Sequence, residues 1–354
     1  MESRQVLTRG VGLVSAALLV MFATQVSAQE EGQGRRGQGG RGIWGDWQVA
    51  VQIGEVEMSS ILSFSRGEDR SWKGEWISAF GISEIQDVKF EENKLSFTPI
   101  FRMGGNETRA QFAGTIAEGK LTGTVSSDQG EAPVVGKRAP RQPWAVGSWA
   151  MVTKMEEREY KGTLEIAAGE AGELRGEYKA ERGEYEVTDL KLERRALSFK
   201  LAIKMEDSEF EVAFAGELGR EGLTGAFKSD EGEAQSTGTR LGAEVIGRWD
   251  LEVATDNGTT KQRLTVNRDL SGLWGSLPVK KIELDGDKVS FKAVVKWGER
   301  EFPVSFAGTI QEDAITGELT SAQGTSKVTG KKRPARPRGG RGQRGQRPAR
   351  PTRI

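Results

Sequence analysis

Apolar and polar residues alternate along most of the chain after residue 43. The stretch "FAGTIAEGKLTGTV" (residues 112–125) shows two such runs, in which every second residue is apolar or glycine and mostly Thr or Ala lies between. A period of two residues is typical of a half-buried β-strand, and the turn-rich "AEGK" between the runs is typical of a hairpin connection. The pattern therefore predicts a β-hairpin over residues 112–125.

Eight strands of this kind are predicted between residues 47 and 138. The connections between them are too short for crossover helices, so neighbouring strands should be antiparallel. No stretch beyond residue 28 combines a long 3.6-residue period with helix caps. The predicted strands centre on 47–51, 61–64, 72–76, 88–90, 95–99, 109–116, 121–126 and 132–138.

The hairpin sequence occurs three times, beginning at Phe112, Phe214 and Phe306. The Gly-x-Trp tripeptides at residues 45–47, 147–149 and 247–249 open the same three units, but the third unit is eight residues shorter between its Gly-x-Trp and its "VSF". Gly272, the counterpart of Gly74 and Gly176, divides this loss into two equal halves. We expect such losses to fall in loops, where length changes are tolerated best.

The fold class predicted from these repeats is all-β, with three tandem small antiparallel up-and-down β-barrels of about eight strands each. A closed barrel removes the exposed strand edges. The alternative is a β-propeller, which would need a period of about 40–50 residues that the units do not show. The predicted domains are a signal peptide (1–28), a Gly/Arg-rich disordered linker (29–42), barrels over 43–140, 141–242 and 243–332, and a disordered Arg/Pro/Gly-rich tail (333–354).

The first 28 residues have the pattern of a secretory signal peptide. Two arginines precede the apolar run 11–23, and "VSA" at 26–28 fits a cleavage site. The alternative, a transmembrane anchor, would need about 17–25 apolar residues. We therefore predict an exported protein, periplasmic or extracellular.

Charge is unevenly distributed, although the formal net charge is zero. Residues 331–354 contain ten Lys or Arg and no acidic residue, so the rest of the chain carries a charge of −10. Pro, Gly and Arg cannot build a core, and we expect residues 333–354 to be disordered with local polyproline character. Anionic envelope polymers, lipid surfaces and extracellular nucleic acid are the expected partners, and a solubilising linker is the alternative reading. The candidate polyanion-binding residues are Arg333, Arg336, Arg338, Arg341, Arg344, Arg347, Arg350 and Arg353.

Histidine and cysteine are absent from the sequence. This excludes disulfides, Ser-His-Asp and Cys-His catalysis, and metal sites that need His or thiolate ligands. The carboxylates of Glu156 and Glu157 are expected on a solvated face, and Asp128 and Asp230, replaced by Ala322 in the third unit, fit ordinary turns better than Ca²⁺ loops. We therefore predict no enzyme activity, no cofactor and no metal site.

The Gly-x-Trp at the start of each unit and the Gly-x-Arg or Gly-x-Lys at its end resemble the calycin superfamily of lipocalin and avidin barrels. The resemblance implies that a basic side chain packs over each tryptophan and closes one end of the barrel. The implied pairs are Trp47 with Arg138, Trp149 with Arg240, and Trp249 with Lys332.

The hairpin motif is also similar to the small C-terminal β-domain of exported bacterial amidohydrolase-like proteins. The metal-binding histidines of those enzymes have no counterpart here, so their activity does not carry over. Each unit is shorter than an ordinary lipocalin, which argues against a roomy cavity.

Two sets of repeated residues could line a ligand site or only pack the barrels. Gly114 and Gly123, with their copies, would approach a ligand, or give room for curvature and for the tryptophan; we favour the second reading. The shared aromatic position (Trp76, Tyr178 and Trp274) is expected in the core. Trp72 and Trp297 have no aromatic counterparts and are expected to make contacts specific to their unit.

The function predicted from these features is an exported, non-enzymatic binding protein of the cell envelope whose basic tail contacts anionic polymers or surfaces. The alternative is a carrier that holds a small apolar ligand inside its barrels.

Overall fold

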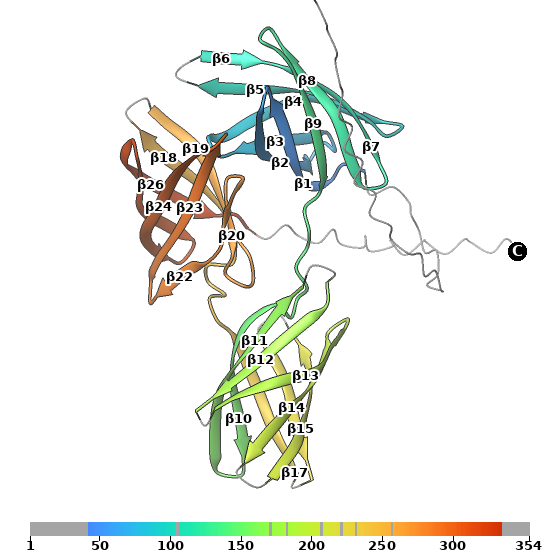
Figure 1. Ribbon diagram of the computed structural model, residues 1–354, viewed down its shortest axis with the longest axis vertical. Helices are drawn as coiled ribbons and strands as arrows, with labels where there is room; N and C mark the ends of the chain where they lie inside the picture. The colour runs from blue at the N-terminus through green and yellow to red at the C-terminus, as the bar shows by residue number, and fades with distance from the viewer. Residues whose placement is uncertain are drawn as a thin grey trace, which may run out of the picture. The chain divides into compact units, whose positions relative to one another are not determined.

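The computed structural model describes residues 42–334, apart from residues 104–105, 170–171, 182, 206–207, 220–221, 231 and 256–257. The described residues form 26 β-strands in three antiparallel barrels (Figure 1). This confirms the predicted all-β class and the three tandem barrels. The predicted signal peptide, and all but Arg333 and Pro334 of the C-terminal segment, lie outside the described residues.

Barrel 1 is built from the first nine strands. Strand β4 pairs with β5 and closes a ring of eight, and β6 extends β5 beyond it. Its strands are β1 (Gly45–Ile53), β2 (Val56–Arg66), β3 (Trp72–Ser78), β4 (Gly81–Glu91), β5 (Lys94–Met103), β6 (Asn106–Arg109), β7 (Gln111–Ala117), β8 (Lys120–Ser127) and β9 (Gly130–Arg138).

Barrel 2 is a closed ring of eight strands in sequence order. Its strands are β10 (Gly147–Met155), β11 (Arg158–Ala168), β12 (Leu174–Ala180), β13 (Gly183–Glu193), β14 (Ala196–Met205), β15 (Ser208–Leu218), β16 (Leu223–Ser229) and β17 (Gly232–Arg240).

Barrel 3 is a sheet of nine strands that ends at β21 on one side and β22 on the other, and these two ends are not hydrogen-bonded to each other. It is therefore open where barrels 1 and 2 are closed. Its strands are β18 (Gly247–Thr255), β19 (Gly258–Val266), β20 (Gly272–Trp274), β21 (Leu277–Val279), β22 (Ile282–Asp285), β23 (Lys288–Trp297), β24 (Arg300–Gln311), β25 (Ala314–Ser321) and β26 (Gly324–Lys332).

The eight residues missing from the third unit are lost from strands, and the expectation that they fall in loops is wrong. The five-residue loop before β20 keeps the length and the closing hydrogen bond of its counterparts before β3 and β12. Instead, β20 and β21 have three residues each, where β12 and β13 have seven and eleven. Both hairpins lose two residues from each strand. Losses in pairs keep every remaining side chain on its original face of the sheet.

Paired glycines in the repeated hairpin accommodate a phenylalanine ring. Gly114 and Gly123 pair across β7 and β8, and a Cβ atom on either would lie 2.7 Å or less from the Phe112 ring. The rings of Phe214 and Phe306 lie in the same way over their own glycine pairs. These glycines therefore do provide room for a neighbouring side chain, as we favoured from the sequence. That side chain is the phenylalanine and not the tryptophan.

Aromatic side chains fill the middle of each barrel. The Phe112 ring stacks on Phe97 with 4.4 Å between centroids, and both side chains are about 1% exposed. Phe199 and Phe214 stack at 4.7 Å in barrel 2, and Phe291 and Phe306 at 5.2 Å in barrel 3. Burial of these rings is the main hydrophobic contribution at this level of each core.

Candidate functional site: the clasp between the first and third barrels

One end of each barrel is closed by a tryptophan beneath a cationic side chain. The Arg138 guanidinium carbon lies 4.4 Å from the ring centroid of Trp47, and Arg240 lies 4.0 Å from Trp149. In barrel 3 the Lys332 ammonium lies 5.5 Å from Trp249. Each cation is also the strand-register partner of its tryptophan. The first and last strands thus meet at these pairs, which have the geometry of a calycin-like barrel end.

The arginines also bind backbone carbonyls that lead into the barrels. Arg240 donates to the carbonyl oxygens of Val146 and Trp144, the second at 2.5 Å. Burial and the nearby charge of Arg268 lower the pKa of Arg240 to about 10, so it remains a cation at neutral pH. These hydrogen bonds fix the path by which the chain enters barrel 2, so the pair of Trp149 and Arg240 has a structural role.

The open side of barrel 3 receives the tip of a hairpin from barrel 1. This tip, residues 78–81 between β3 and β4, is bonded by the Gln262 amide, which donates to the carbonyl oxygens of Ser78 at 3.3 Å and Ala79 at 3.2 Å. Ala79 packs against the core of barrel 3. The Phe80 ring meets the edge of Trp297 at 6.4 Å. The longer hairpin of barrel 1 therefore takes the place that the shortened β20–β21 hairpin leaves.

A backbone contact at the tip requires glycine. Gly275 lies in the β20–β21 turn with φ of +60°, and a Cβ atom there would lie 2.2 Å from the Ser78 carbonyl oxygen. A larger residue would suffer both the left-handed conformation and this overlap.

Four charged side chains join the two barrels beside the tip. The Arg263 side chain, only 3% exposed, donates to both oxygens of Glu75 at 2.8 and 3.1 Å and to Asp250 at 2.9 Å. Arg333 bonds the same two carboxylates, at 3.2 Å to Glu75 and 2.8 Å to Asp250. We call this group (Glu75, Asp250, Arg263 and Arg333) the clasp.

In the clasp, the opposite charges affect the pKa values of Glu75 and Arg263 more than burial does. Burial alone would raise the pKa of Glu75, but hydrogen bonds and charge from Arg263 and Arg333 lower it below its usual value of 4.5. Burial would likewise lower the pKa of Arg263, and the two carboxylates raise it instead. Glu75 and Arg263 are thus both ionised at neutral pH, and each stabilises the charged form of the other.

A second ion pair lies near the clasp. Asp46 of β1 pairs with Arg248 of β18 and also accepts a hydrogen bond from the Ser63 hydroxyl at 2.7 Å. The carbonyl oxygen of Arg248 accepts the backbone N–H of Arg333 at 2.6 Å. The first strands of barrels 1 and 3 and the start of the C-terminal segment are therefore connected by direct contacts.

Of the eight candidate polyanion-binding arginines, the structure describes Arg333, and it engages this residue in the clasp. Arg336 and the six that follow it lie outside the described residues, so their predicted role stays a prediction.

The other repeated aromatic residues pack internally: Trp76, Tyr178 and Trp274 are 3–6% exposed. Trp72 lies beneath the Arg66 guanidinium at 3.7 Å.

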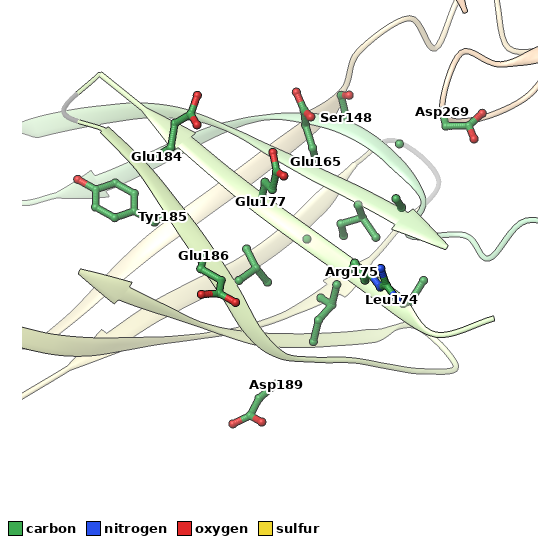
Figure 2. Close-up of a pocket in the computed structure, with 16 residues that line it drawn as sticks. Ser148, Glu165, Leu174, Arg175, Glu177, Glu184, Tyr185, Glu186, Asp189 and Asp269 are labelled. Carbon is green, nitrogen blue, oxygen red and sulfur yellow. The ribbon is translucent and has the colours of Figure 1, made fainter. Parts of the chain in front are cut away.

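Barrel 2 carries an acidic surface pocket of about 880 Å³ (Figure 2). Glu165, Glu177 and Glu186 are register neighbours across β11, β12 and β13, and Lys179 lies 3.7 Å from the first two. Like charges on adjacent strands repel. This surface therefore disfavours anionic ligands.

The described residues contain no group of three His, Cys, Asp or Glu that could hold a metal ion. Over the same residues, no helix is long and apolar enough to cross a membrane.

No protein-family model matches the sequence, and no curated protein is similar to it. Among solved structures, a provisionally assigned outer membrane protein of Bacteroides fragilis aligns with 82% of this chain and 98% of its own, at 10% identity and a TM-score of 0.22. Transferrin binding protein B of Haemophilus parasuis aligns with 81% of this chain and 74% of its own, at 11% identity and a TM-score of 0.19. The same protein of Neisseria meningitidis aligns with 78% and 65%, at 12% identity and a TM-score of 0.19. Likenesses this low assign neither family nor function, and the similarity to the amidohydrolase-associated β-domain stays a prediction.

Sequence reasoning missed the clasp, because its residues lie on outward-facing positions that differ among the repeats. Arg263 takes the register position that Thr163 has in barrel 2 and Ile61 in barrel 1. One feature of the sequence could have indicated the clasp. The third repeat alone has an arginine at this outward-facing position, and the same repeat has lost strand residues nearby.

Proposed function

We propose that this protein is an exported, non-enzymatic binding protein of the cell envelope whose Arg-rich C-terminal segment contacts anionic polymers or surfaces. The observation that carries the proposal is the anchoring of Arg333 to Glu75 and Asp250. This anchor ties the start of the segment to two barrels, while seven further arginines follow without any acidic residue. Arginine clusters bind phosphate and carboxylate groups through paired hydrogen bonds.

The barrels fit the role of a scaffold. One end of each barrel is closed by a cation–tryptophan pair, and the centre of each is filled by stacked phenylalanines. The acidic pocket of barrel 2 would repel a polyanion. Attraction to such a partner is therefore assigned to the basic segment.

The test compares the full chain with a chain that ends at Pro334. This truncation keeps Arg333, so the clasp is preserved and only seven arginines are removed. Binding to single-stranded DNA and to vesicles rich in phosphatidylglycerol is measured over a salt series. On DNA, loss of seven phosphate contacts should reduce the slope of log K against log salt by up to about 5, at roughly 0.7 per contact.

Two full-length variants serve as matched controls. Replacing the seven arginines by lysine keeps the charge and should keep most of the salt slope, whereas replacing them by glutamine should remove it. Equal affinity and equal slope for the full and the truncated chain would overturn the proposal.

The alternative, a carrier of a small apolar ligand, would depend on the end of barrel 2 that lies opposite the Trp149–Arg240 pair. Tyr160 and Phe210 are 39% and 40% exposed there, on the inward-facing alternation of β11 and β15. The stacked rings below leave this end as the place for a ligand. A fluorescent apolar probe that binds the full chain and is lost in Phe210→Ser would support the alternative, and no binding would reject it.

A further inference from the structure

A groove of about 520 Å³ lies between the outer face of barrel 1 and the β20–β21 hairpin of barrel 3. Its volume is within the range of roughly 300–1,000 Å³ that is typical of small-molecule sites. We propose that this groove binds a small amphipathic anion, a single apolar chain with a carboxylate head. The inference goes beyond the proposed function, because it involves neither the C-terminal segment nor the interior of a barrel.

Two lysines form the basic part of the groove. Lys120 of β8 and Lys137 of β9 are direct register partners, and both are exposed. Like charges directly opposite each other on neighbouring strands repel. Among the described residues that line the groove, none is acidic, so no carboxylate of the groove compensates the two ammonium groups. A carboxylate bound by both lysines would relieve the repulsion through charge-assisted hydrogen bonds.

Next to the lysines, the barrel 1 side of the groove offers apolar surface. Gln48 of β1 pairs with Lys137 on one side and with Ile61 of β2 on the other, and Ala50 pairs with Val135 in the next outward row. Val135 is 55% exposed, which leaves a large apolar side chain in contact with water. A hydrocarbon chain in the groove would remove this surface from water. Charge and apolar surface therefore lie side by side, as an amphipathic anion requires.

The barrel 3 side of the groove is apolar in this repeat alone. Leu273 of β20 and Pro278 of β21 are outward register partners, and both line the groove. Barrels 1 and 2 carry two glutamates at the same positions: Glu75 with Glu84, and Glu177 with Glu186. The third repeat thus lacks two negative charges that would repel an anion, and it has apolar side chains in their place.

A buried hydroxyl group in the groove lacks a hydrogen-bond partner. Ser276, in the turn between β20 and β21, is 5% exposed, and its Oγ atom has no partner among the described residues. A buried hydroxyl without a partner destabilises the folded state. Because Ser276 lines the groove, rotation about χ1 can direct its hydroxyl to a bound carboxylate, which accepts several hydrogen bonds at once. The groove therefore offers a ligand one unused donor besides the two lysines.

The first test measures the binding of decanoate to the full chain by titration calorimetry, below the concentration at which decanoate forms micelles. Decanol has the same chain without the charge, and acetate has the charge without the chain. We expect decanoate to bind at least about tenfold more tightly than either, because each of the two lacks one part of the contacts. Binding of decanol or acetate as tight as that of decanoate, or no binding of decanoate, would overturn the inference.

The second test removes the basic part of the groove. Lys120→Gln together with Lys137→Gln should weaken decanoate binding about tenfold, the sum of two partly exposed ion pairs, and leave decanol binding unchanged. The matched control is Lys288→Gln with Lys292→Gln, which removes the same charge from exposed positions of β23 that do not line the groove. It should bind decanoate as the native chain does. Equal losses in the two double variants would contradict the inference.

The third test restores an acidic residue on the barrel 3 side. Pro278→Glu introduces the residue type that the other two barrels have there, and Pro278→Gln is its neutral counterpart. Pro278 is exposed, so neither change disturbs the core. We expect decanoate to bind about fivefold more weakly to the glutamate variant than to the glutamine variant. Equal affinities would contradict the placement of the anion in this groove.

The fourth test separates a ligand-binding role of Ser276 from a structural one. Ser276→Ala should raise the thermal unfolding midpoint of the ligand-free chain, because the unpaired hydroxyl is removed. The same variant should bind decanoate about fivefold more weakly, because one hydrogen bond to the ligand is lost. Unchanged binding, or a fall in the unfolding midpoint, would overturn the assignment of this hydroxyl to the site.

Two further full-length variants distinguish the groove from the other candidate sites. The variant with glutamine in place of Arg336 and the six arginines that follow it should bind decanoate as the native chain does, and so should Phe210→Ser. If the glutamine variant loses decanoate, the carboxylate binds the C-terminal segment, and the groove inference fails while the proposed function stands. If Phe210→Ser loses it, the ligand enters barrel 2, and the inference fails in favour of the carrier alternative.

Discussion

Barrels 2 and 3 are copies of one unit, yet barrel 2 closes on itself while barrel 3 is completed by a hairpin from barrel 1. In barrel 2, Gly162 pairs with Ala180 near the tip of the β12–β13 hairpin. In barrel 3 the equivalent residue is Gln262, and its partners are the carbonyl groups of Ser78 and Ala79. Because strand residues were lost in pairs, barrel 3 is open and accepts the hairpin tip, while the same side chains as before face its core.

Barrels 2 and 3 also differ in where they place their charged side chains. Barrel 2 places Glu165 and Glu177 side by side on its exposed surface, and Lys179 lies 3.7 Å from each of them. Barrel 3 instead buries Arg263 between two carboxylates, one of them from barrel 1. Exposed pairs contribute little to stability, whereas breaking a buried pair leaves an uncompensated charge. The clasp should therefore dominate the coupling of barrels 1 and 3, and barrel 2 should respond little to its loss.

The largest effect is expected for Arg263→Met. The change leaves the carboxylates of Glu75 and Asp250 without their main partner and should cost about 3 kcal/mol, the low end for a broken buried pair because Asp250 is partly exposed. Hydrogen exchange should show faster opening of β3, β4 and β19, with β10–β17 unchanged. Equal acceleration in all three barrels would contradict the distinction.

A somewhat smaller effect is expected for Gly275→Ala, and Gly286→Ala is its matched control. Both glycines have φ near +60°, but nothing lies within 4 Å of a Cβ atom at Gly286, whereas the Ser78 carbonyl oxygen lies 2.2 Å from one at Gly275. Both variants should lose about 1 kcal/mol from backbone strain, and Gly275→Ala should lose about 1–2 kcal/mol more from the overlap. Chemical unfolding measures both. Equal losses would show that the hairpin tip does not sit against Gly275.

Acid should weaken the contact between barrels 1 and 3 before it affects barrel 2. The pKa of Glu75 is lower in the folded state than its usual 4.5, so its stabilising contribution is present above about pH 4.5 and is lost as pH falls through the folded-state pKa. Hydrogen exchange at β3 and β19, followed from about pH 7 to about pH 3, would detect this loss. In Glu75→Gln the same strands should open more easily at neutral pH and show less additional loss in acid.

The smallest effect concerns the closed ends. Lys332 lies farther from its tryptophan than Arg138 or Arg240, and it donates to the backbone carbonyl oxygen of Glu244 at 2.6 Å. Lys332→Arg should bring a planar cation over Trp249 and stabilise barrel 3 by about 0.5 kcal/mol. Arg240→Lys should have the opposite sign in barrel 2. A rise in the free energy of unfolding for both changes would contradict this account.

The repeated hairpin shows how far local pattern extends. Alternation at Phe112 and its copies predicts the strands, and the paired glycines predict close packing at that point. The identity of the packed group, the phenylalanine ring, depends on how the hairpin curves, which alternation does not encode. The Gly272 offset likewise locates the lost residues but cannot show whether they come from loop or strand.

The all-β class and the three units could be predicted from the sequence, because strand period and repeated spacing are local signals that survive without knowledge of the fold. The pairing of each tryptophan with a cation was implied by the resemblance to calycin barrels. Three features became visible only in the folded chain: barrel 3 is open, the hairpin tip of barrel 1 enters it, and Arg263 and Arg333 share two carboxylates. These contacts join residues about 190 to 260 positions apart on outward-facing positions. An outward charge looks the same in sequence whether it meets water or another barrel, and only the packing of the barrels distinguishes the two.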